Sequence, residues 1–240
     1  MQKFKGVLLA LLILSPVCSF AKFPGILSRF QLGYSFVMNS GTQELKYPVS
    51  SGDTIIKRDL KTSAAFGVTA GTYVPIKRLG QSSMLVFGVD FMYNMMTWKP
   101  TTGDEGTIGF DGLTAQMALP VGLDFKFGAD ALNVKDKRFC ATLGFGAFPS
   151  YALTTIENTP LSFDPVFSVA PYAKAEVGVF AGICMKVRAI AAFGKIGYLE
   201  YTDKDLNSTT SFYGNTNFAV SLLIMPFSFT WQREEWWNTY

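Results

Sequence analysis

The chain contains no histidine, and this removes most of the chemistry that its other side chains could perform. Serine and cysteine nucleophiles commonly depend on a histidine general base, as do the serine triads and their variants. A zinc site would need cysteine and carboxylate ligands alone, and Cys140 and Cys184 are too few and too widely separated. We therefore predict that the protein is not an enzyme and holds no metal ion or other cofactor.

The charged residues with the most informative spacing lie in segments where every second residue is apolar. On strands they would share the inner face, because successive side chains of a strand point to opposite sides. A buried charge must be paired, since an isolated one would cost many kcal/mol. We hypothesise an ion-pair network that plugs the interior, with a narrow ion path gated by the same pairs as the alternative. The members of this network are Asp90, Asp124, Lys126, Lys174, Glu176 and Arg188.

Eight segments carry this alternation and must position the charged residues. The clearest runs from Leu113 to Phe127, where apolar side chains occupy every second position without a break. Strands of soluble proteins average about 5–6 residues, whereas a tilted strand that crosses a bilayer and continues beyond it is longer. The eight predicted strands are 29–38, 61–74, 84–98, 113–127, 138–151, 166–182, 187–201 and 217–231.

Connections between the predicted strands alternate in length. The long, polar ones are 39–60, 99–112, 152–165 and 202–216, and the shorter ones lie near 75–83, 128–137 and 183–186. This pattern predicts an all-β fold: an eight-stranded antiparallel transmembrane β-barrel with long extracellular loops, short periplasmic turns and both termini in the periplasm. As an alternative within the first loop, Thr54, Ile55 and Ile56 could extend the second strand well above the membrane.

Irregular pairing is expected at four places inside the predicted strands. Pro120 and Pro171 cannot donate to a ladder, and a closed barrel has no edge strand, so we expect a β-bulge at each. The alternation is also irregular at Ile196–Gly197 and slips between Leu222 and Leu223, which predicts two further bulges.

The N-terminal segment has the order of a secretory signal peptide, with basic residues before an apolar run and Ser19-Phe20-Ala21 after it. We expect cleavage of residues 1–21, which leaves 22–231 as the barrel and 232–240 as a short periplasmic aromatic tail. Lipidation at Cys18 is the alternative reading of this segment.

The charge balance argues against nucleic acid as a partner. Without Lys3 and Lys5 the chain has 19 basic and 18 acidic residues, whereas a nucleic-acid-binding protein is expected to carry a basic stripe.

Cys140 and Cys184 fall near the periplasmic rim of the predicted barrel. In an oxidising compartment they form either a disulfide or two unpaired thiols.

Two segments carry a resemblance to a known family. Leu119–Phe127 looks like the fourth strand of that family, and the glycine-rich Phe139–Tyr151 looks like the strand that follows it. Over about 29–231 the chain resembles small bacterial outer-membrane β-barrel proteins of the OmpA-domain, OmpX and OmpW type. The closer likeness is to the outer-membrane β-barrel-domain proteins of Bacteroidetes. The resemblance implies an outer-membrane location, with membrane lipid, lipopolysaccharide and the barrel-assembly machinery as partners.

The C-terminal end resembles the insertion signal of such barrels, which is an aromatic residue preceded by apolar residues at every second position. Phe227, Phe229 and Trp231 fit this signal, and residues 232–240 follow as an extra tail. The tail is interpreted as an interfacial anchor, a docking element or a disordered end. Asp53-Thr54-Ile55 matches a short O-glycosylation pattern, which makes Thr54 a candidate for modification.

These features favour a non-enzymatic integral barrel that serves as a structural or interaction protein, as a subunit or partner of a larger envelope complex. The alternative is a stand-alone channel for small solutes or ions. The narrow lumen of an eight-stranded barrel, just wide enough to be filled by side chains, favours the first reading over the second.

Overall fold

A computed structural model describes residues 23–49, 52–100, 112–132, 137–156, 165–203 and 208–231. The expected signal segment 1–21 and the expected tail 232–240 lie outside these residues. None of the helices within the described ranges is long and apolar enough to cross a membrane.

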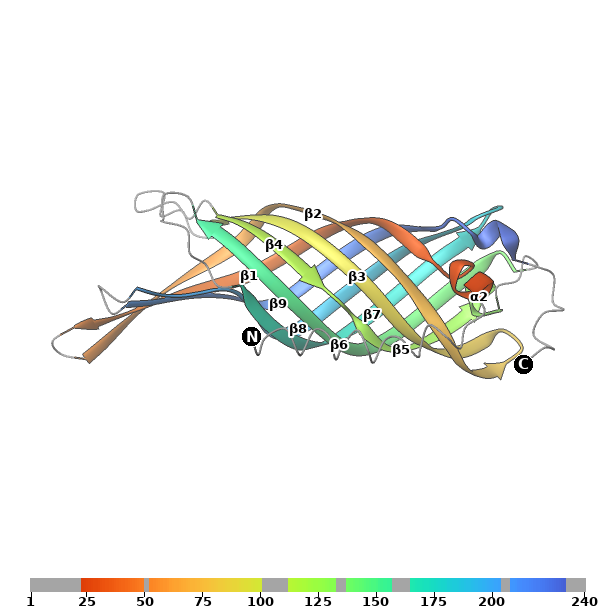
Figure 1. Cartoon of the computed structure of the whole chain (residues 1–240), viewed down its shortest axis with the longest axis horizontal. Coiled ribbons are helices and arrows are strands. Elements are labelled where there is room, and N and C mark those ends of the chain that lie inside the picture. Colours follow the sequence, from red (N-terminus) through yellow and green to blue (C-terminus); the bar gives the residue numbers. More distant parts are fainter. Residues whose placement is uncertain are drawn as a thin grey trace.

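The described chain is built almost entirely from antiparallel strands (Figure 1). The strands are β1 (Gln31–Val49), β2 (Gly52–Gly80), β3 (Ser83–Pro100), β4 (Gly112–Ala118), β5 (Val121–Gly128), β6 (Phe139–Ile156), β7 (Val166–Phe180), β8 (Cys184–Asp203) and β9 (Ser208–Met225). Three short helical turns accompany them: α2 (Phe23–Leu27), α3 (Ala129–Leu132) and η1 (Ser228–Thr230).

The strands close into a ring of eight positions, which confirms the predicted barrel. β1 pairs with both β2 and β9, and the ladders continue from β9 through β8, β7 and β6. β4 and β5 lie end to end between β6 and β3, so together they form the fourth wall position. β3 pairs with β2 and completes the closure. A closed barrel satisfies the backbone of every strand in its ladders, which a bilayer requires.

The outer face of this ring is apolar. Along 113–127 the predicted outward residues are exposed or half-buried, and the residues between them are buried. Exposed apolar side chains on other strands continue the same belt around the wall, and lipid is the surrounding that such a belt requires. Members of the belt include Tyr34, Phe36, Phe66, Val68, Phe87, Phe91, Met117, Leu119, Phe145, Val177, Val187, Leu222 and Ile224. The wall therefore has the construction of a barrel that spans a bacterial outer membrane.

The expected bulges at the two prolines are wrong. Across Pro120 the register stays continuous, because Ala118 pairs with Met92 and Val121 with Val89. The Pro120 carbonyl still accepts a hydrogen bond from the Asp90 amide at 2.9 Å, so only the missing proline N–H interrupts the ladder. Pro171 sits in an unbroken β6–β7 ladder, and the β7–β8 ladder starts one residue later.

Strand β8 does contain the irregularity predicted at Ile196–Gly197. Its register with β9 shifts between Phe193 and Ile196 and again between Gly197 and Leu199. The bulge expected between Leu222 and Leu223 is wrong, because β9 keeps one register there with both β1 and β8. Leu222 points outward and Leu223 points inward as one of the apolar residues of the lumen, so two adjacent apolar residues do not mark a bulge here.

Two of the predicted loops are in large part strand. β1 and β2 stay paired to Val49 and Gly52, and β8 and β9 stay paired to Asp203 and Ser208, so 39–60 and 202–216 are wrong as loops. The β2–β3 ladder starts only at Leu60. Beyond the level of Leu60, the ends of β1, β2, β8 and β9 leave the ring. They stay paired with one another, and β1 pairs with β9 as far as Lys46. We call residues 42–49, 52–59, 200–203 and 208–211 the projecting sheet (left of Figure 1).

The chain end also departs from the prediction. β9 ends at Met225, so the last strand does not reach Trp231. Pro226 follows directly and cannot donate to a ladder, which ends the strand. Phe227 and Phe229 are exposed, whereas Trp231 is buried and its indole donates to the carbonyl of Ser28, which directly follows α2. Their role as an insertion signal stays a prediction.

Candidate functional site

The lumen of the barrel holds the candidate site, and its charged side chains come mainly from four strands, with β6 lying between β5 and β7. Asp90 projects from β3, Asp124 and Lys126 from β5, Lys174 and Glu176 from β7, and Lys186 and Arg188 from β8. In β5, β7 and β8 the two charged residues are two positions apart. Alternate side chains of a strand point to the same face, so both turn inward. Asp130 joins them from α3, which follows β5 directly.

One half of the network is arranged around Lys174. Its Nζ lies 3.0 Å from Asp90 Oδ2 and 2.8 Å from Asp124 Oδ2. On the other side of Asp90, Arg188 Nη1 lies 2.9 Å from Oδ1. Arg188 also donates through Nε to Glu176 Oε1 at 2.6 Å, so this arginine joins the two halves.

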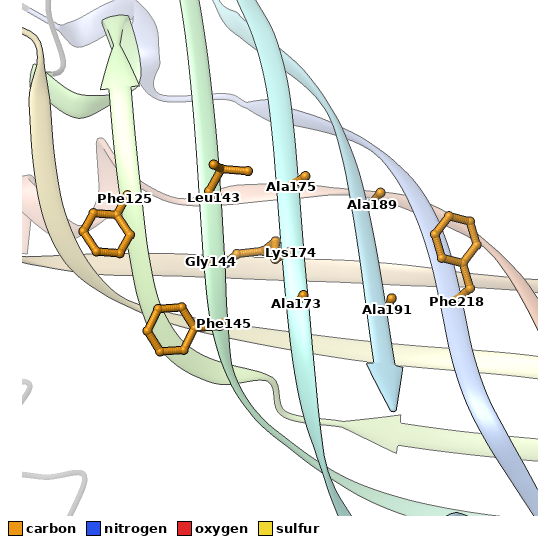
Figure 2. A pocket seen from close by; sticks show the side chains of 10 residues that line it. All are labelled: Phe125, Leu143, Gly144, Phe145, Ala173, Lys174, Ala175, Ala189, Ala191 and Phe218. Carbon is orange, nitrogen blue, oxygen red and sulfur yellow. The ribbon is translucent and has the colours of Figure 1, made fainter. Parts of the chain in front are cut away.

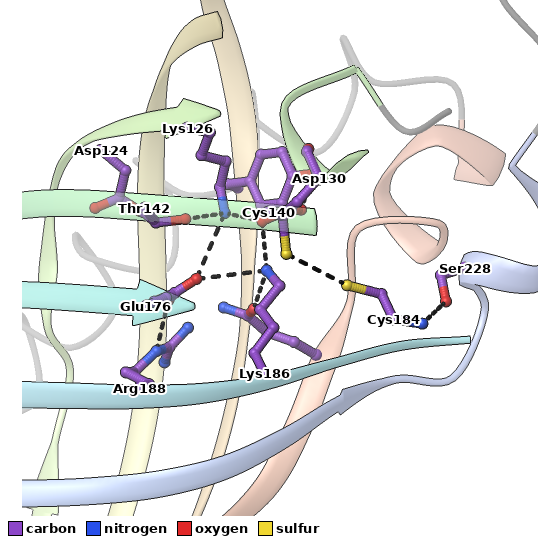
Figure 3. Close-up of polar contacts among 12 residues, drawn as sticks. Asp124, Lys126, Asp130, Cys140, Thr142, Glu176, Cys184, Lys186, Arg188 and Ser228 are labelled. Carbon is purple, nitrogen blue, oxygen red and sulfur yellow. Dashed lines mark hydrogen bonds and ion pairs between the residues drawn. The ribbon is translucent and has the colours of Figure 1, made fainter. Parts of the chain in front are cut away.

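The other half is arranged around Glu176 and Asp130 (Figure 3). Lys126 Nζ lies 2.5 Å from Asp130 Oδ2 and 3.8 Å from Glu176 Oε2. Lys186 pairs with the same two carboxylates, at 3.4 Å from Glu176 Oε2. The Tyr73 hydroxyl donates to Asp130 Oδ1 at 2.7 Å, and Lys126 Nζ lies 4.2 Å from the centre of the Tyr73 ring.

The complete network is electrically balanced and almost fully buried. Four carboxylates face four cations, and each of these side chains exposes at most 2% of its surface. Charges removed from water in this way are stable only when each has a partner of opposite sign. The arrangement can hold the wall together and close the lumen, but it presents no nucleophile with an adjacent base.

All six charged residues that the sequence assigned to the lumen lie within this one network. Lys186 and Asp130 were missed for different reasons. Lys186 would have been found if the seventh strand had been started at Cys184, because it occupies the same inner row as Arg188. Asp130 comes from a helical turn, where the alternation of a strand gives no information about which way a side chain points.

Inward glycines make room for the carboxylates. A Cβ atom on Gly144 would lie 2.1 Å from Asp124 Oδ1, and one on Gly71 would lie 2.0 Å from Asp90 Oδ1. These distances are shorter than any atomic contact allows, so a larger residue would displace the ion pairs. Gly71 and Gly144 therefore provide the space that the charge network occupies.

A layer of amides and hydroxyls lies beyond the charges. Gln116 Oε1 accepts hydrogen bonds from Asn94 Nδ2 at 3.3 Å and from Asn217 Nδ2 at 2.9 Å. Ser35 and Ser221 hydroxyl oxygens are 2.8 Å apart. The lumen is thus bridged by side chains between the ionic layer and the opposite end.

An aromatic cluster fills the lumen at the end nearest the projecting sheet. Trp98 packs edge-on against Phe212 with ring centres 4.7 Å apart, and its ring centre lies 5.1 Å from that of Tyr198. The Trp98 indole donates to Thr114 Oγ1 at 2.9 Å, and Asn39 Nδ2 donates to the Tyr198 hydroxyl at 3.0 Å. Side chains therefore close the barrel at two levels, one ionic and one aromatic.

The opposite end is closed by the C-terminal segment. Trp231 stacks on Phe180 with ring centres 5.4 Å apart, and its indole donates to the Ser28 carbonyl at 2.9 Å. Ser228 Oγ accepts a hydrogen bond from the Cys184 amide at 2.7 Å. Cys184 and Cys140 are buried beside this cap with their sulfurs 3.8 Å apart and not bonded to each other.

The lipid-facing wall carries a shallow hollow over β5 to β9 (Figure 2). Ala173, Ala175, Ala189 and Ala191 form its low part, with Phe125 and Phe145 on one side and Phe218 on the other. Its outward-pointing side chains are all apolar. The hollow can accommodate hydrocarbon and offers no group for chemistry.

The remaining candidate positions are not brought into the lumen. Thr54 lies in the part of β2 that belongs to the projecting sheet, so it stands on a strand and not in a loop. Its modification stays a prediction. Among the described residues, no group of three or more cysteine, aspartate or glutamate side chains is placed to hold a metal ion.

Several solved outer-membrane proteins have structures similar to this one at low sequence identity. No family model and no curated protein matches the chain. Outer membrane protein OprG from Pseudomonas aeruginosa is similar in structure, with 8% identity over 81% of this chain and 94% of that chain and a TM-score of 0.49. Outer membrane protein AlkL has 12% identity over 82% and 88%, with a TM-score of 0.47. The outer membrane protease OmpT from Escherichia coli has 7% identity over 82% and 96%, with a TM-score of 0.37. The likeness to the Bacteroidetes family stays a prediction.

Proposed function

We propose that this small outer-membrane β-barrel is a closed, non-enzymatic structural or interaction protein that acts as a subunit or partner of a larger envelope complex. The observation that carries the proposal is the double closure of the lumen. An ionic layer around Glu176 and an aromatic layer around Trp98 occupy the interior of the barrel. A barrel closed in this way acts through its outer surfaces.

The projecting sheet is the surface best suited to a protein partner. Among the residues that the structure describes, β2 beyond Leu60 forms a ladder with β1 alone, so this part of β2 is an edge strand of the projecting sheet. Such an edge pairs readily with an added strand, which contributes main-chain hydrogen bonds. Ile55 and Ile56 expose 54% and 47% of their surface on this strand and can pack against the partner's side chains.

The first experiment is to extract the full-length protein from native outer membranes in mild detergent, identify what accompanies it and weigh the particle. A stoichiometric set of envelope proteins is the expected result. A variant in which residues 42–57 are replaced by a short turn should still insert, because the replaced hairpin lies beyond the β2–β3 ladder, but should lose those proteins.

The matched control keeps the hairpin and changes only a lipid-facing side chain, such as Phe139→Leu, at a position that is 75% exposed. This variant should retain its partners. A native particle of the barrel's own mass, with no associated protein, would contradict the proposal.

The rival function is a stand-alone channel for small solutes or ions. Conductance of the purified wild-type barrel in planar bilayers distinguishes the two, because a lumen closed by the ion pairs and the aromatic cluster should pass no single-channel current. Lipid, lipopolysaccharide and the assembly machinery complete the proposed partners, with acyl chains in the hollow over β7 and β8.

A further inference from the structure

The outer face of the wall changes from apolar to charged side chains toward the projecting sheet. Within the apolar belt, Phe66 of β2 pairs with Phe36 of β1 on one side and with Met95 of β3 on the other. Phe36 and Phe66 expose 59% and 61% of their surface, so this level faces lipid hydrocarbon. Further along β2 and β3 the outer face carries hydroxyl groups, because Ser63 and Thr97 lie there with their hydroxyl oxygens 2.8 Å apart.

Two lysines follow at the next outward position. Lys61 of β2 and Lys99 of β3 are directly opposite each other in the ladder, and both are exposed. Their neighbour Trp98 is buried in the lumen, so Lys99 points to the outer face. Lys99 comes four residues after Met95, which is about 13 Å along a strand at about 3.3 Å per residue. This distance reaches from the hydrocarbon into the layer of lipid head groups.

The two ammonium groups repel each other, because like charges directly opposite in a ladder are destabilising. Among the residues that the structure describes, neither lysine has a carboxylate within ion-pair distance. Asp59, two residues away from Lys61 on β2, accepts a hydrogen bond from Thr42 Oγ1 at 3.0 Å. On its other side Lys61 pairs with Ser40, which offers a hydroxyl and no charge. An anion shared by both lysines would remove the repulsion.

We propose that Lys61 and Lys99 together bind a phosphate group of lipopolysaccharide. The lipid part of that molecule is an acylated, phosphorylated disaccharide, so it presents hydrocarbon, hydroxyl groups and phosphate. The wall presents the matching order of apolar, hydroxyl and cationic side chains, and lysine is a common partner of phosphate. The lysines lie at the end that carries the projecting sheet, which is the end predicted to be extracellular. The proposal rests on lipopolysaccharide being a partner in the proposed function and specifies the residues that bind it.

The experiment measures binding of purified diphosphoryl lipid A to the full-length barrel in detergent, with native mass spectrometry counting the bound lipid. We expect several-fold lower occupancy when Lys61→Gln and Lys99→Gln are combined, because neutral amides do not balance the phosphate charge. Lys61→Arg combined with Lys99→Arg should retain binding, since guanidinium groups also pair with phosphate. Equal occupancy of the wild type and the glutamine double variant would overturn the proposal.

The matched control removes two cations from the other end of β2, where Lys77 and Arg78 are also exposed. Lys77→Gln combined with Arg78→Gln should bind diphosphoryl lipid A as the wild type does. An equal loss in this control would show that net charge alone governs binding, and the assigned site would be wrong. Dephosphorylated lipid A should bind equally to the wild type and to the Lys61 and Lys99 double variant.

Phosphatidylglycerol is the second probe, because it supplies phosphate from an ordinary phospholipid. Binding as tight as that of diphosphoryl lipid A, with the same loss in the glutamine double variant, would reject lipopolysaccharide as the partner. Both lysines are exposed, so the variant should stay folded, which is checked by its migration on gels without heating. Extraction from native membranes separates this site from the protein complex. The glutamine double variant should keep its protein partners, whereas a partner-free barrel that binds lipid A at these lysines would contradict only the complex.

Discussion

At the scale of single residues, the buried charges depend on each other. Glu176 is placed between Arg188, Lys186 and Lys126, so its removal would leave three cations with one carboxylate fewer. Breaking a buried pair by removing one partner typically destabilises a protein by about 3–5 kcal/mol, because the remaining charge stays buried. We expect Glu176→Ala to lower the free energy of unfolding by this amount, measured by urea unfolding of the barrel in lipid vesicles. The control is Glu44→Gln on the projecting sheet, where the Lys57 partner is 63% exposed and little change is expected.

A second residue-scale prediction concerns the pH dependence of that exposed contact. Lys57 Nζ lies 2.7 Å from Glu44 Oε1, and the Tyr213 hydroxyl donates to the same oxygen at 2.7 Å. The hydrogen bond from Lys57, followed by that from Tyr213, lowers the pKa of Glu44 below its ordinary value of 4.5. The contact therefore contributes above the ordinary pKa and is lost as the pH falls through the lowered one. An NMR titration of the Glu44 carboxyl should show its midpoint rising in Lys57→Met, and an unchanged midpoint would refute this explanation.

At the scale of elements, the aromatic cluster joins strands that are distant in the sequence. Trp98 of β3 packs on Tyr198 of β8 and on Phe212 of β9. Replacing a buried tryptophan or phenylalanine with alanine typically costs about 3–5 kcal/mol, because a cavity remains. We expect Trp98→Ala to lose stability in this range in the same unfolding assay. Phe145→Ala, at a belt position that is 55% exposed, should lose less because lipid fills the space. Equal losses would show that the cluster is not a packed core.

At the scale of the whole molecule, the two closures act in series along the lumen. Loss of one should leave the other in place, so Glu176→Ala and Trp98→Ala alone should pass no more current than the wild type. The double variant removes a side chain from both layers and should give measurable single-channel openings in planar bilayers. A conducting wild type would reject the closed-barrel function, and a non-conducting double variant that remains folded would assign closure to the amide and hydroxyl layer or to the C-terminal segment at the opposite end.

The sequence by itself determined the wall, because alternation along a strand that faces lipid on one side and a narrow lumen on the other is a direct physical requirement. It therefore predicted the eight positions, the apolar face of 113–127 and six members of the charge network. It failed where neither face is lipid or lumen: most side chains of the projecting sheet are exposed or half-buried on both faces, so no strict alternation marked its strands and they were predicted mainly as loops. Tertiary structure alone decided the inward turn of Trp231 after Pro226, the entry of Asp130 from α3 and the meeting of Cys140 with Cys184. Each depends on which segments the closed ring brings together, and local sequence periodicity carries no record of that.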